Sequence, residues 1–181
     1  MTNSFYSKQI SNRNYLSPTG FKFNLAKTPK VDFFSSSAKI PGIQLGSIGV
    51  GNYLKEVPIP GDTIQYEDLT LSFLVDENME NYMEIHNWIY GIGYPKSVQQ
   101  FKDFVNDRGD VDNMKQFSDG TLVILNSNYN PTIYVRFTDM FPVSLSALEF
   151  TASENDYTYF TATVTFKYLL YEIFDTQFNL L

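Results

Sequence analysis

The chain holds few residues of the kinds that do chemistry on a substrate. It has no cysteine, and its single histidine is His86. The missing thiols exclude a disulfide framework, a thiolate metal site and a cysteine nucleophile. A lone imidazole excludes a metal site or a proton relay that needs two histidines from one chain. His86 falls at the edge of a predicted helix stripe, where a structural role is the simpler interpretation. We therefore predict that the chain is not an enzyme and binds no cofactor or metal.

Two acidic clusters could still carry chemistry. Asp76 and Glu77 are adjacent, so in an extended chain they point to opposite sides, whereas a catalytic carboxylate pair must converge. They precede a predicted helix, and we expect them to cap its N-terminus. Residues 107–113, DRGDVDN, resemble a calcium loop. Their glycine is misplaced for that motif, and Phe117, Ser118 and Asp119 stand where its terminal glutamate is required. No glycine-rich phosphate loop or nucleophile elbow is found.

Composition limits the partners of the chain. Its 181 residues, 43% of them hydrophobic, suffice for one domain with a core. The net charge of -7 repels nucleic acid and anionic membranes. Its simple interpretation is solubility, and the alternative is a surface past which nucleic acid moves without binding. No stretch reaches the roughly 18 apolar residues of a membrane span, and the N-terminus lacks a secretory signal. We expect no membrane contact, and assembly in the cytoplasm. The 16 Phe and 13 Tyr residues favour either strands or oligomer interfaces.

Alternating apolar and polar residues indicate a β-rich domain. We predict a flexible arm over residues 1–19, a β domain over 20–174 with an insertion loop at 94–118, and a tail at 175–181. A short helix on Val98, Phe101 and Val105 is possible within the insertion. The strands are predicted over 21–25, 31–40, 69–75, 121–125, 133–138 with a continuation at 141–145, and 160–170, and the last is expected to be the longest. In the fifth of these, Phe141, Val143 and Leu145 are expected to point inward, with a bend near Ser146.

Two further elements complete the predicted fold. A helix is expected from Asn78 to Gly91, and its packing residues are Tyr82, Ile85, Trp88 and Ile89. The glycines between Ile43 and Val57 indicate bends or a long hairpin that projects from the body. The hairpin residues that we expect to contact other subunits are Gly46, Ile48, Val50, Tyr53, Leu54, Val57 and Pro60. The predicted fold class is mainly β, with two packed antiparallel sheets or a squashed barrel and one flanking helix.

The order of these motifs resembles the tail tube proteins of contractile phages, specifically the T-even family, which is related in fold to the type VI secretion tube protein. The resemblance begins with GFKFNLAK, FFSSSAKIPGI and GSIGVGNYLKEVPIPG. Its centre is GDTIQYEDLTLSFLVDENMENYMEIHNW, a Gly-Asp turn, a strand, an acidic stop and a helix that ends near Trp88. It closes with FPVSLSALEFTASENDYTYFTATVTFKY. The departures are residues 94–118 and 1–19.

The resemblance implies a virion structural protein. Six copies would form a ring, and rings would stack into a tube inside a contractile sheath, through which genomic DNA passes. The implied partners are further copies, the sheath protein, the baseplate or tube initiator and the tail terminator. The polar face of two strands is expected to line the bore, through Thr161, Thr163, Thr165, Thr70 and Ser72. Two alternatives stay open: a tube-initiating baseplate component of the same fold, and a β-rich module that binds carbohydrate or protein.

Overall fold

The structure of the chain is a computed structural model. It describes residues 16–28, 35–93, 102, 116–151 and 159–181. The first strands are β1 (Phe21–Leu25), β2 (Ser35–Ala38), β3 (Ile43–Val50), β4 (Val57–Tyr66) and β5 (Leu69–Leu74). They are followed by helix α2 (Glu80–Gly93), β6 (Ser118–Leu125), β7 (Pro131–Leu145), β8 (Thr161–Lys167) and β9 (Leu170–Phe174). The predicted strand over 31–40 is described only as β2. The predicted helix on Val98, Phe101 and Val105 lies outside the described residues.

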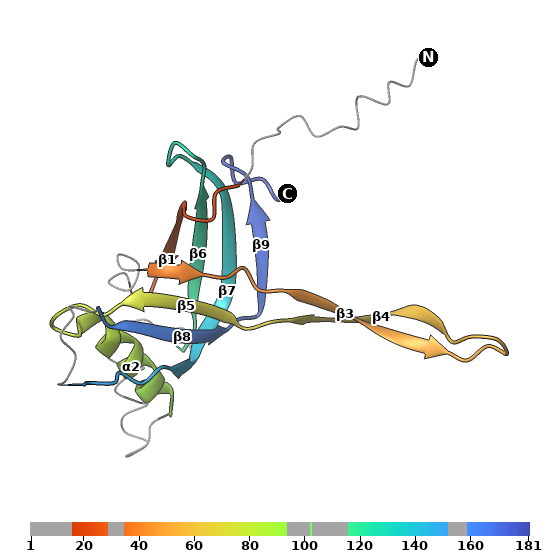
Figure 1. Cartoon of the computed structure of the whole chain (residues 1–181), viewed down its shortest axis with the longest axis horizontal. Coiled ribbons are helices and arrows are strands. Elements are labelled where there is room, and N and C mark those ends of the chain that lie inside the picture. The colour runs from red at the N-terminus through yellow and green to blue at the C-terminus, as the bar shows by residue number, and fades with distance from the viewer. Residues whose placement is uncertain (1–15, 29–34, 94–101, 103–115, 152–158) are drawn as a thin grey trace, which may run out of the picture.

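Two antiparallel layers share strand β7. The first half of β7 pairs with β6 and β9, and β6 pairs with β1. The second half of β7 pairs with β8, which continues through β5 to β2. In Figure 1, β6, β7 and β9 run upright while β5 and β8 cross the view beside them. A strand that passes from one sheet to the other makes the corner of a crossed packing. The prediction of a mainly β fold with two antiparallel sheets and one helix is confirmed.

Strand β7 turns this corner through two bulges. The first lies between its pairings with Ser118 and Gly120, where Asp139 has a φ of 53°. The second lies between Pro142 and Ser144, so Val143 is the extra residue. Val143 is consequently 47% exposed. The prediction that Val143 points inward is wrong, because the bulge shifts the alternation before the bend that was expected near Ser146.

The final predicted strand is also two strands. β8 ends at Lys167, Leu169 donates its amide to the carbonyl of Thr138, and β9 then pairs with the first half of β7. The break at Tyr168 and Leu169 moves the chain from one layer to the other. The longest strand is β7, with 15 residues. The prediction that the strand over 160–170 is the longest is therefore wrong.

Alternation along the strands builds the core between the layers. Phe23 and Leu25 of β1 face Leu69, Leu71 and Phe73 of β5 across the domain as members of one buried cluster. The other members from the strands are Leu122, Ile124, Val135, Phe137, Met140, Ala162, Val164 and Phe166. Helix α2 adds Ile85 and Trp88, which are 0% and 2% exposed. Trp88 lies 6.0 Å from the ring of Phe166 and donates its Nε1 hydrogen to the carbonyl of Gln116. The helix is therefore part of the core.

A buried amide fixes the start of the helix. Asn81 is 1% exposed, and its Nδ2 donates to the Leu74 carbonyl at 2.7 Å. Its backbone amide donates to Oδ1 of Asp76, and its own Oδ1 accepts the amide hydrogens of Asp76 and Tyr82. Asp76 therefore accepts an amide hydrogen from the first turn. The helix begins at Glu80 and ends at Gly93, so both of its ends lie two residues later than predicted. Asn81 joins the end of β5 to α2.

We predict that Asn81→Ala lowers the free energy of unfolding by about 1–3 kcal/mol, because it leaves buried polar groups of the chain without a partner. Urea denaturation measures the change. The control is Asn87→Ala on the exposed side of the same helix, which we expect to change stability by less than about 0.5 kcal/mol. Equal effects of the two substitutions would contradict this role of Asn81.

Candidate functional site

The described residues do not assemble a site for chemistry. No group of His, Asp and Glu side chains among them could hold a metal ion. The ring of His86 stacks on Tyr90 within the same helix, with ring centroids 5.4 Å apart. The loop Asp107–Asn113 lies outside the described residues. None of the described helical segments has the length and apolar character needed to cross a bilayer. The features that could carry a function are surfaces.

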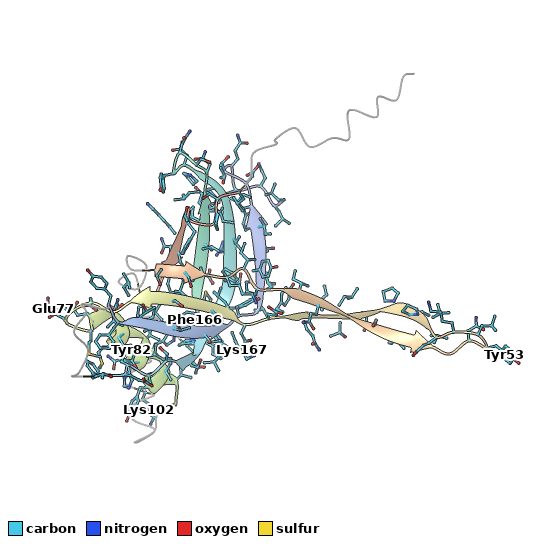
Figure 2. The ribbon with its side chains drawn as sticks, in the orientation of Figure 1. Tyr53, Glu77, Tyr82, Lys102, Phe166 and Lys167 are labelled. Atoms are coloured by element: carbon cyan, nitrogen blue, oxygen red, sulfur yellow. The ribbon has the colours of Figure 1, made fainter. Side chains whose placement is uncertain are left out.

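The hairpin of β3 and β4 is the first such surface. It projects from the body of the domain (Figure 1) and carries Tyr53 at its far end (Figure 2). Its two strands pair with each other, and none of their residues belongs to the buried core. Tyr53 and Leu54 are 98% and 90% exposed. The other exposed apolar side chains of the hairpin are Ile43, Leu45, Ile48, Val50, Val57, Ile59, Ile64 and Tyr66. An isolated two-stranded hairpin is at best marginally stable in water, so this one needs cover.

The apolar side chains occupy opposite faces in the two halves of the hairpin. Side chains alternate along a strand, so Ile43 and Leu45 lie on one face of β3 and Ile48 and Val50 lie on the other. The partner strand makes the same change, from Ile64 and Tyr66 on one face to Val57 and Ile59 on the other, because the two extra residues around Gly61 leave its alternation in phase with β3. The cross-strand apolar pairs are Ile43 with Tyr66 and Leu45 with Ile64 near the base, and Ile48 with Ile59 and Val50 with Val57 near the tip. Covering them requires contact from both sides.

Two prolines reduce the number of backbone hydrogen-bond donors along one edge of the hairpin. Pro58 and Pro60 of β4 pair with Gly49 and Ser47 of β3. Proline has no amide hydrogen, and within a sheet it occupies positions whose donor would face away from the partner strand. Both residues therefore remove outward donors from the edge of β4, which disfavours the addition of another strand there. The distal half of the hairpin presents side chains, rather than backbone, to a neighbour.

An aromatic cluster clamps the base of the hairpin to the body. Tyr66 at the end of β4 contacts Tyr168 and Tyr171, at centroid distances of 6.0 and 5.6 Å. Both of these tyrosines contact Phe137 of the core. The hydroxyl of Tyr168 donates to the carbonyl of Glu67 at 2.8 Å, and that of Tyr171 donates to the carbonyl of Pro41 at 3.2 Å. Both ends of the hairpin are thus held by Tyr168, in the link between β8 and β9, and by Tyr171 of β9.

Charge supports the same junction. The Glu67 carboxylate accepts from Lys39 Nζ at 3.0 Å and from the Gly42 amide at 3.3 Å. The hydrogen bond from Lys39 has the largest effect on the pKa of Glu67 and lowers it, and the hydrogen bond from Gly42 lowers it further. Burial raises the pKa of Tyr168 to about 12. Its hydroxyl therefore stays protonated and keeps its bond to the Glu67 carbonyl at neutral pH.

The outer face of the second layer is the other candidate surface. Thr163 and Thr165 of β8 pair with Ser72 and Thr70 of β5 on the side away from the core, and the hydroxyls of Ser72 and Thr163 lie 3.1 Å apart. Thr161 lies on the same face and pairs with Leu74, whose side chain is apolar where the other two partners on β5 carry hydroxyls. Ser36 of β2 donates its hydroxyl hydrogen to the Ser72 carbonyl, so the hydroxyl surface continues onto a third strand. The alternation thus places all of the predicted bore residues on one face.

A comparison of the whole sequence with protein families decides its membership. Residues 1–174 match the phage tail tube protein family. The chain belongs to the phage tail tube protein family. The predicted family is therefore confirmed, and so is the prediction that this tail tube protein is not an enzyme, because the family consists of structural tube proteins. Among curated proteins, none matches its sequence.

Solved structures share the fold of this tail tube protein. The cap that terminates the tube of the anti-feeding prophage matches with a TM-score of 0.61 and 16% identity, over 96% of this chain and 99% of that one. A chain of the sheath–tube complex of the extracellular contractile injection system PVC matches with a TM-score of 0.55 and 16% identity, over 91% and 94%. The sheath/tube terminator of that system has a TM-score of 0.53 and 18% identity, over 90% and 99%.

The sequence did not reveal the clamp at the base of the hairpin. Tyr66 lies far along the chain from Tyr168 and Tyr171, and the high tyrosine content indicated interfaces without naming a residue. The third strand of the hydroxyl surface was also missed. Its signal was the run Ser35–Ser37, which had only weakened the prediction of a strand.

We predict that Tyr168→Phe loosens the base of the tail tube protein's hairpin. The Glu67 amide donates to the Gly42 carbonyl at 3.0 Å. Its hydrogen exchange should become about 2- to 10-fold faster, since a neutral hydrogen bond contributes about 0.5–1.5 kcal/mol. The phenol that titrates near pH 12 should also disappear from the ultraviolet titration. Because a phenol pKa raised from 10.0 to about 12 stabilises the neutral form, this contribution to stability is present below pH 10 and is lost between these values.

The control for this prediction is Tyr159→Phe, which removes a hydroxyl that is exposed to solvent. It should leave both the hydrogen exchange of the Glu67 amide and the phenol titration near pH 12 unchanged. If Tyr168→Phe leaves the exchange unchanged as well, the aromatic cluster does not hold the hairpin.

Proposed function

We propose that this protein is the repeating subunit of a tail tube, in which rings of six copies stack inside a contractile sheath and form a conduit for DNA. The observation that carries the proposal is the β3–β4 hairpin, whose apolar side chains lie outside the core of their own chain. Exposed apolar patches of this extent mark sites of association. Membership of the phage tail tube protein family makes further copies of the chain the natural partner.

The two-sided hairpin supports a position between neighbouring subunits. The apolar pairs near its base face one way, and those near its tip face the other. A subunit on one side would cover the pair Leu45–Ile64, and a second subunit on the opposite side would cover Ile48–Ile59. A hairpin that reaches from one ring into the next meets both conditions. Because the donor and acceptor surfaces then differ, the contact is heterologous and can repeat along an axis.

The hydroxyl surface of β5 and β8 suits the wall of the bore. Thr70, Ser72, Thr163 and Thr165 offer small neutral groups, and their face carries the Lys167–Asp68 ion pair at its edge. A chain of net charge -7 lacks the cationic excess that would anchor phosphates. DNA could therefore slide along such a wall without strong binding. The sheath, the baseplate and the tail terminator would contact the outside and the ends of the tube.

A second candidate within the same system is a component that starts or ends the tube. The likeness to the tube-terminating cap of the anti-feeding prophage favours it. Electron microscopy of the purified protein separates the two: long regular cylinders support the repeating subunit, and isolated rings support the end component.

We predict that shortening the hairpin abolishes assembly without unfolding the body. The variant removes residues 48–59 and joins Ser47 to Pro60 through an Asn-Gly turn, which suits a two-residue hairpin loop. Because the removed residues lie outside the core, the urea midpoint of the monomer should not change. Sedimentation should show only small species, and microscopy should show no cylinders. Cylinders formed by this variant would contradict the proposed function.

We predict that Thr163→Lys gives tubes that retain DNA. Thr163 points away from the core and is half-buried, and a lysine there can extend its charged end into solvent. Tubes of this variant should co-sediment with short duplex DNA at low salt and release it as salt rises. The control is Asn128→Lys in the exposed β6–β7 turn, which adds the same charge and should not retain DNA. Unfolding by Thr163→Lys, or equal retention by both variants, would mean that this face does not line the bore.

A further inference from the structure

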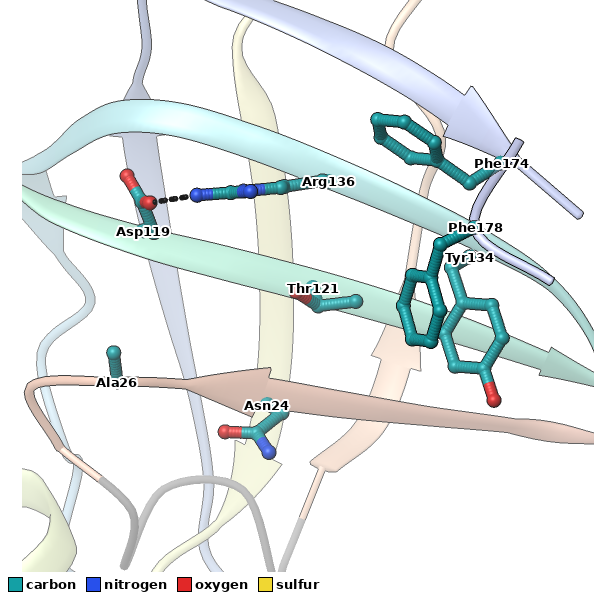
Figure 3. A pocket seen from close by; sticks show the side chains of 8 residues that line it. All are labelled: Asn24, Ala26, Asp119, Thr121, Tyr134, Arg136, Phe174 and Phe178. Carbon is teal, nitrogen blue, oxygen red and sulfur yellow. Dashed lines mark hydrogen bonds and ion pairs between the residues drawn. The ribbon is translucent and has the colours of Figure 1, made fainter. Parts of the chain in front are cut away.

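The outer face of the first layer contains a hollow of 490 Å³. Its floor is made of small side chains, Asn24 of β1, Ala26 just after that strand and Thr121 of β6, while larger side chains rise on both sides (Figure 3). The other lining residues are Asp119, Tyr134, Arg136, Phe174 and Phe178. The hollow is thus shaped by a change of side-chain size across neighbouring strands, and it is large enough to receive a large side chain and part of its neighbour.

One wall of the hollow is aromatic and is built by the end of the chain. The ring of Phe178 stacks on Tyr134 with centroids 5.0 Å apart. The turn that carries Phe178 is closed by Asp175, whose carboxylate accepts the amide hydrogens of Gln177 and Asn179 at 2.8 Å. Phe174 and Leu180 then form a bridge that returns the chain to β9. Residues 175–181 therefore belong to the folded body and complete this wall.

The opposite wall is polar. Arg136 donates to Asp119 at 2.7 Å, and Glu172, its pairing partner on β9, interacts electrostatically with Arg136. The lining thus holds one cation and one carboxylate, and Glu172 places a second carboxylate beside it. Asn24 on the floor offers an amide that can donate or accept. A ligand that suits both walls has an aromatic ring, a polar end and a nearby positive charge.

The hairpin tip has this combination of groups. Tyr53 supplies a ring with a hydroxyl, Leu54 supplies a second apolar side chain, and Lys55 follows. The tip lies at the far end of the hairpin, away from the body of its own chain (Figure 2), so it cannot enter its own hollow in this conformation. Pro58 and Pro60 disfavour strand pairing beside it, which leaves its side chains to make the contact. A nearly fully exposed tyrosine beside an exposed leucine is typical of an interface anchor.

We propose that the hollow on the first layer receives the hairpin tip of a second copy of this chain, with Tyr53 against Phe174 and Phe178 and Lys55 toward Glu172. The inference rests on the proposed function and names the surface on which the hairpin docks. The same contact made by every copy is heterologous, so it propagates from copy to copy.

Paired cysteines test this contact, because the chain has no native cysteine. The full-length variant Asn52→Cys/Thr121→Cys keeps Tyr53 and is oxidised under assembly conditions, and disulfide-linked multimers are measured on a denaturing gel. A disulfide requires Cα atoms within about 7 Å, so a short bifunctional maleimide is used in parallel. Two controls are matched to the pair: Asn52→Cys/Thr165→Cys moves the acceptor to the other layer, and Asp62→Cys/Thr121→Cys moves the donor toward the base of the hairpin.

We expect the first pair to form links about 1000-fold faster than either control, because docked groups react at millimolar effective concentration whereas free copies react at their micromolar concentration. If Thr121→Cys fails to fold, Asn24→Cys on the same floor replaces it. Equal linkage in all pairs, or preferred linkage to Thr165→Cys, while microscopy still shows cylinders, overturns the docking site and leaves the proposed function standing. A further variant, Ser7→Cys/Thr121→Cys, tests residues 1–15 as the occupant of the hollow. If it forms links and the tip pair does not, the hollow receives residues 1–15 and the inference is also overturned. If the wild-type protein does not assemble at all, both the docking site and the proposed function are contradicted.

Discussion

A two-stranded ribbon cannot hold its apolar side chains away from water, because it has no second layer to pack on. The β3–β4 hairpin carries such side chains on both of its faces, and none of them belongs to the core of its own chain. Nothing in the described part of the chain buries them. This constraint underlies the proposal that other copies cover the hairpin, and it would give a direction to the contacts between them.

The body of the domain acts as a rigid mount for that ribbon. Strand β7 ties the two layers together, and Trp88 ties the helix to the core. The tyrosines at the base connect the ribbon to Phe137 in the middle of this body. A hairpin held in this way keeps its angle, so in the proposed tube its tip would reach the next subunit at a defined position. The hydroxyl surface and the hollow lie on opposite layers, which separates the face proposed for DNA from the face proposed for docking.

Local patterns predicted most of the elements, since alternation identifies a strand whose two faces meet different surroundings. They correctly gave the faces of β5 and β8 and the helix stripe around Ile85 and Trp88. They failed where the backbone departs from alternation, as at Val143, and where one apolar run continues across a change of layer, as at Leu169. They could not place Phe178 beside Tyr134 or Tyr66 beside Tyr168, because such contacts depend on the three-dimensional path of the chain and leave no periodic signal.

The central claim is that copies of the chain cover the hairpin. Hydroxyl-radical footprinting of the dilute protein and of the assembled particle measures this directly, because it reports the solvent exposure of individual side chains. We expect Tyr53, Leu54, Ile48 and Ile64 to be oxidised readily in the dilute chain and to be protected in the particle, while the exposed Tyr129 on the β6–β7 turn provides a reference within the same molecule. Equal oxidation of the hairpin in both states would contradict the account.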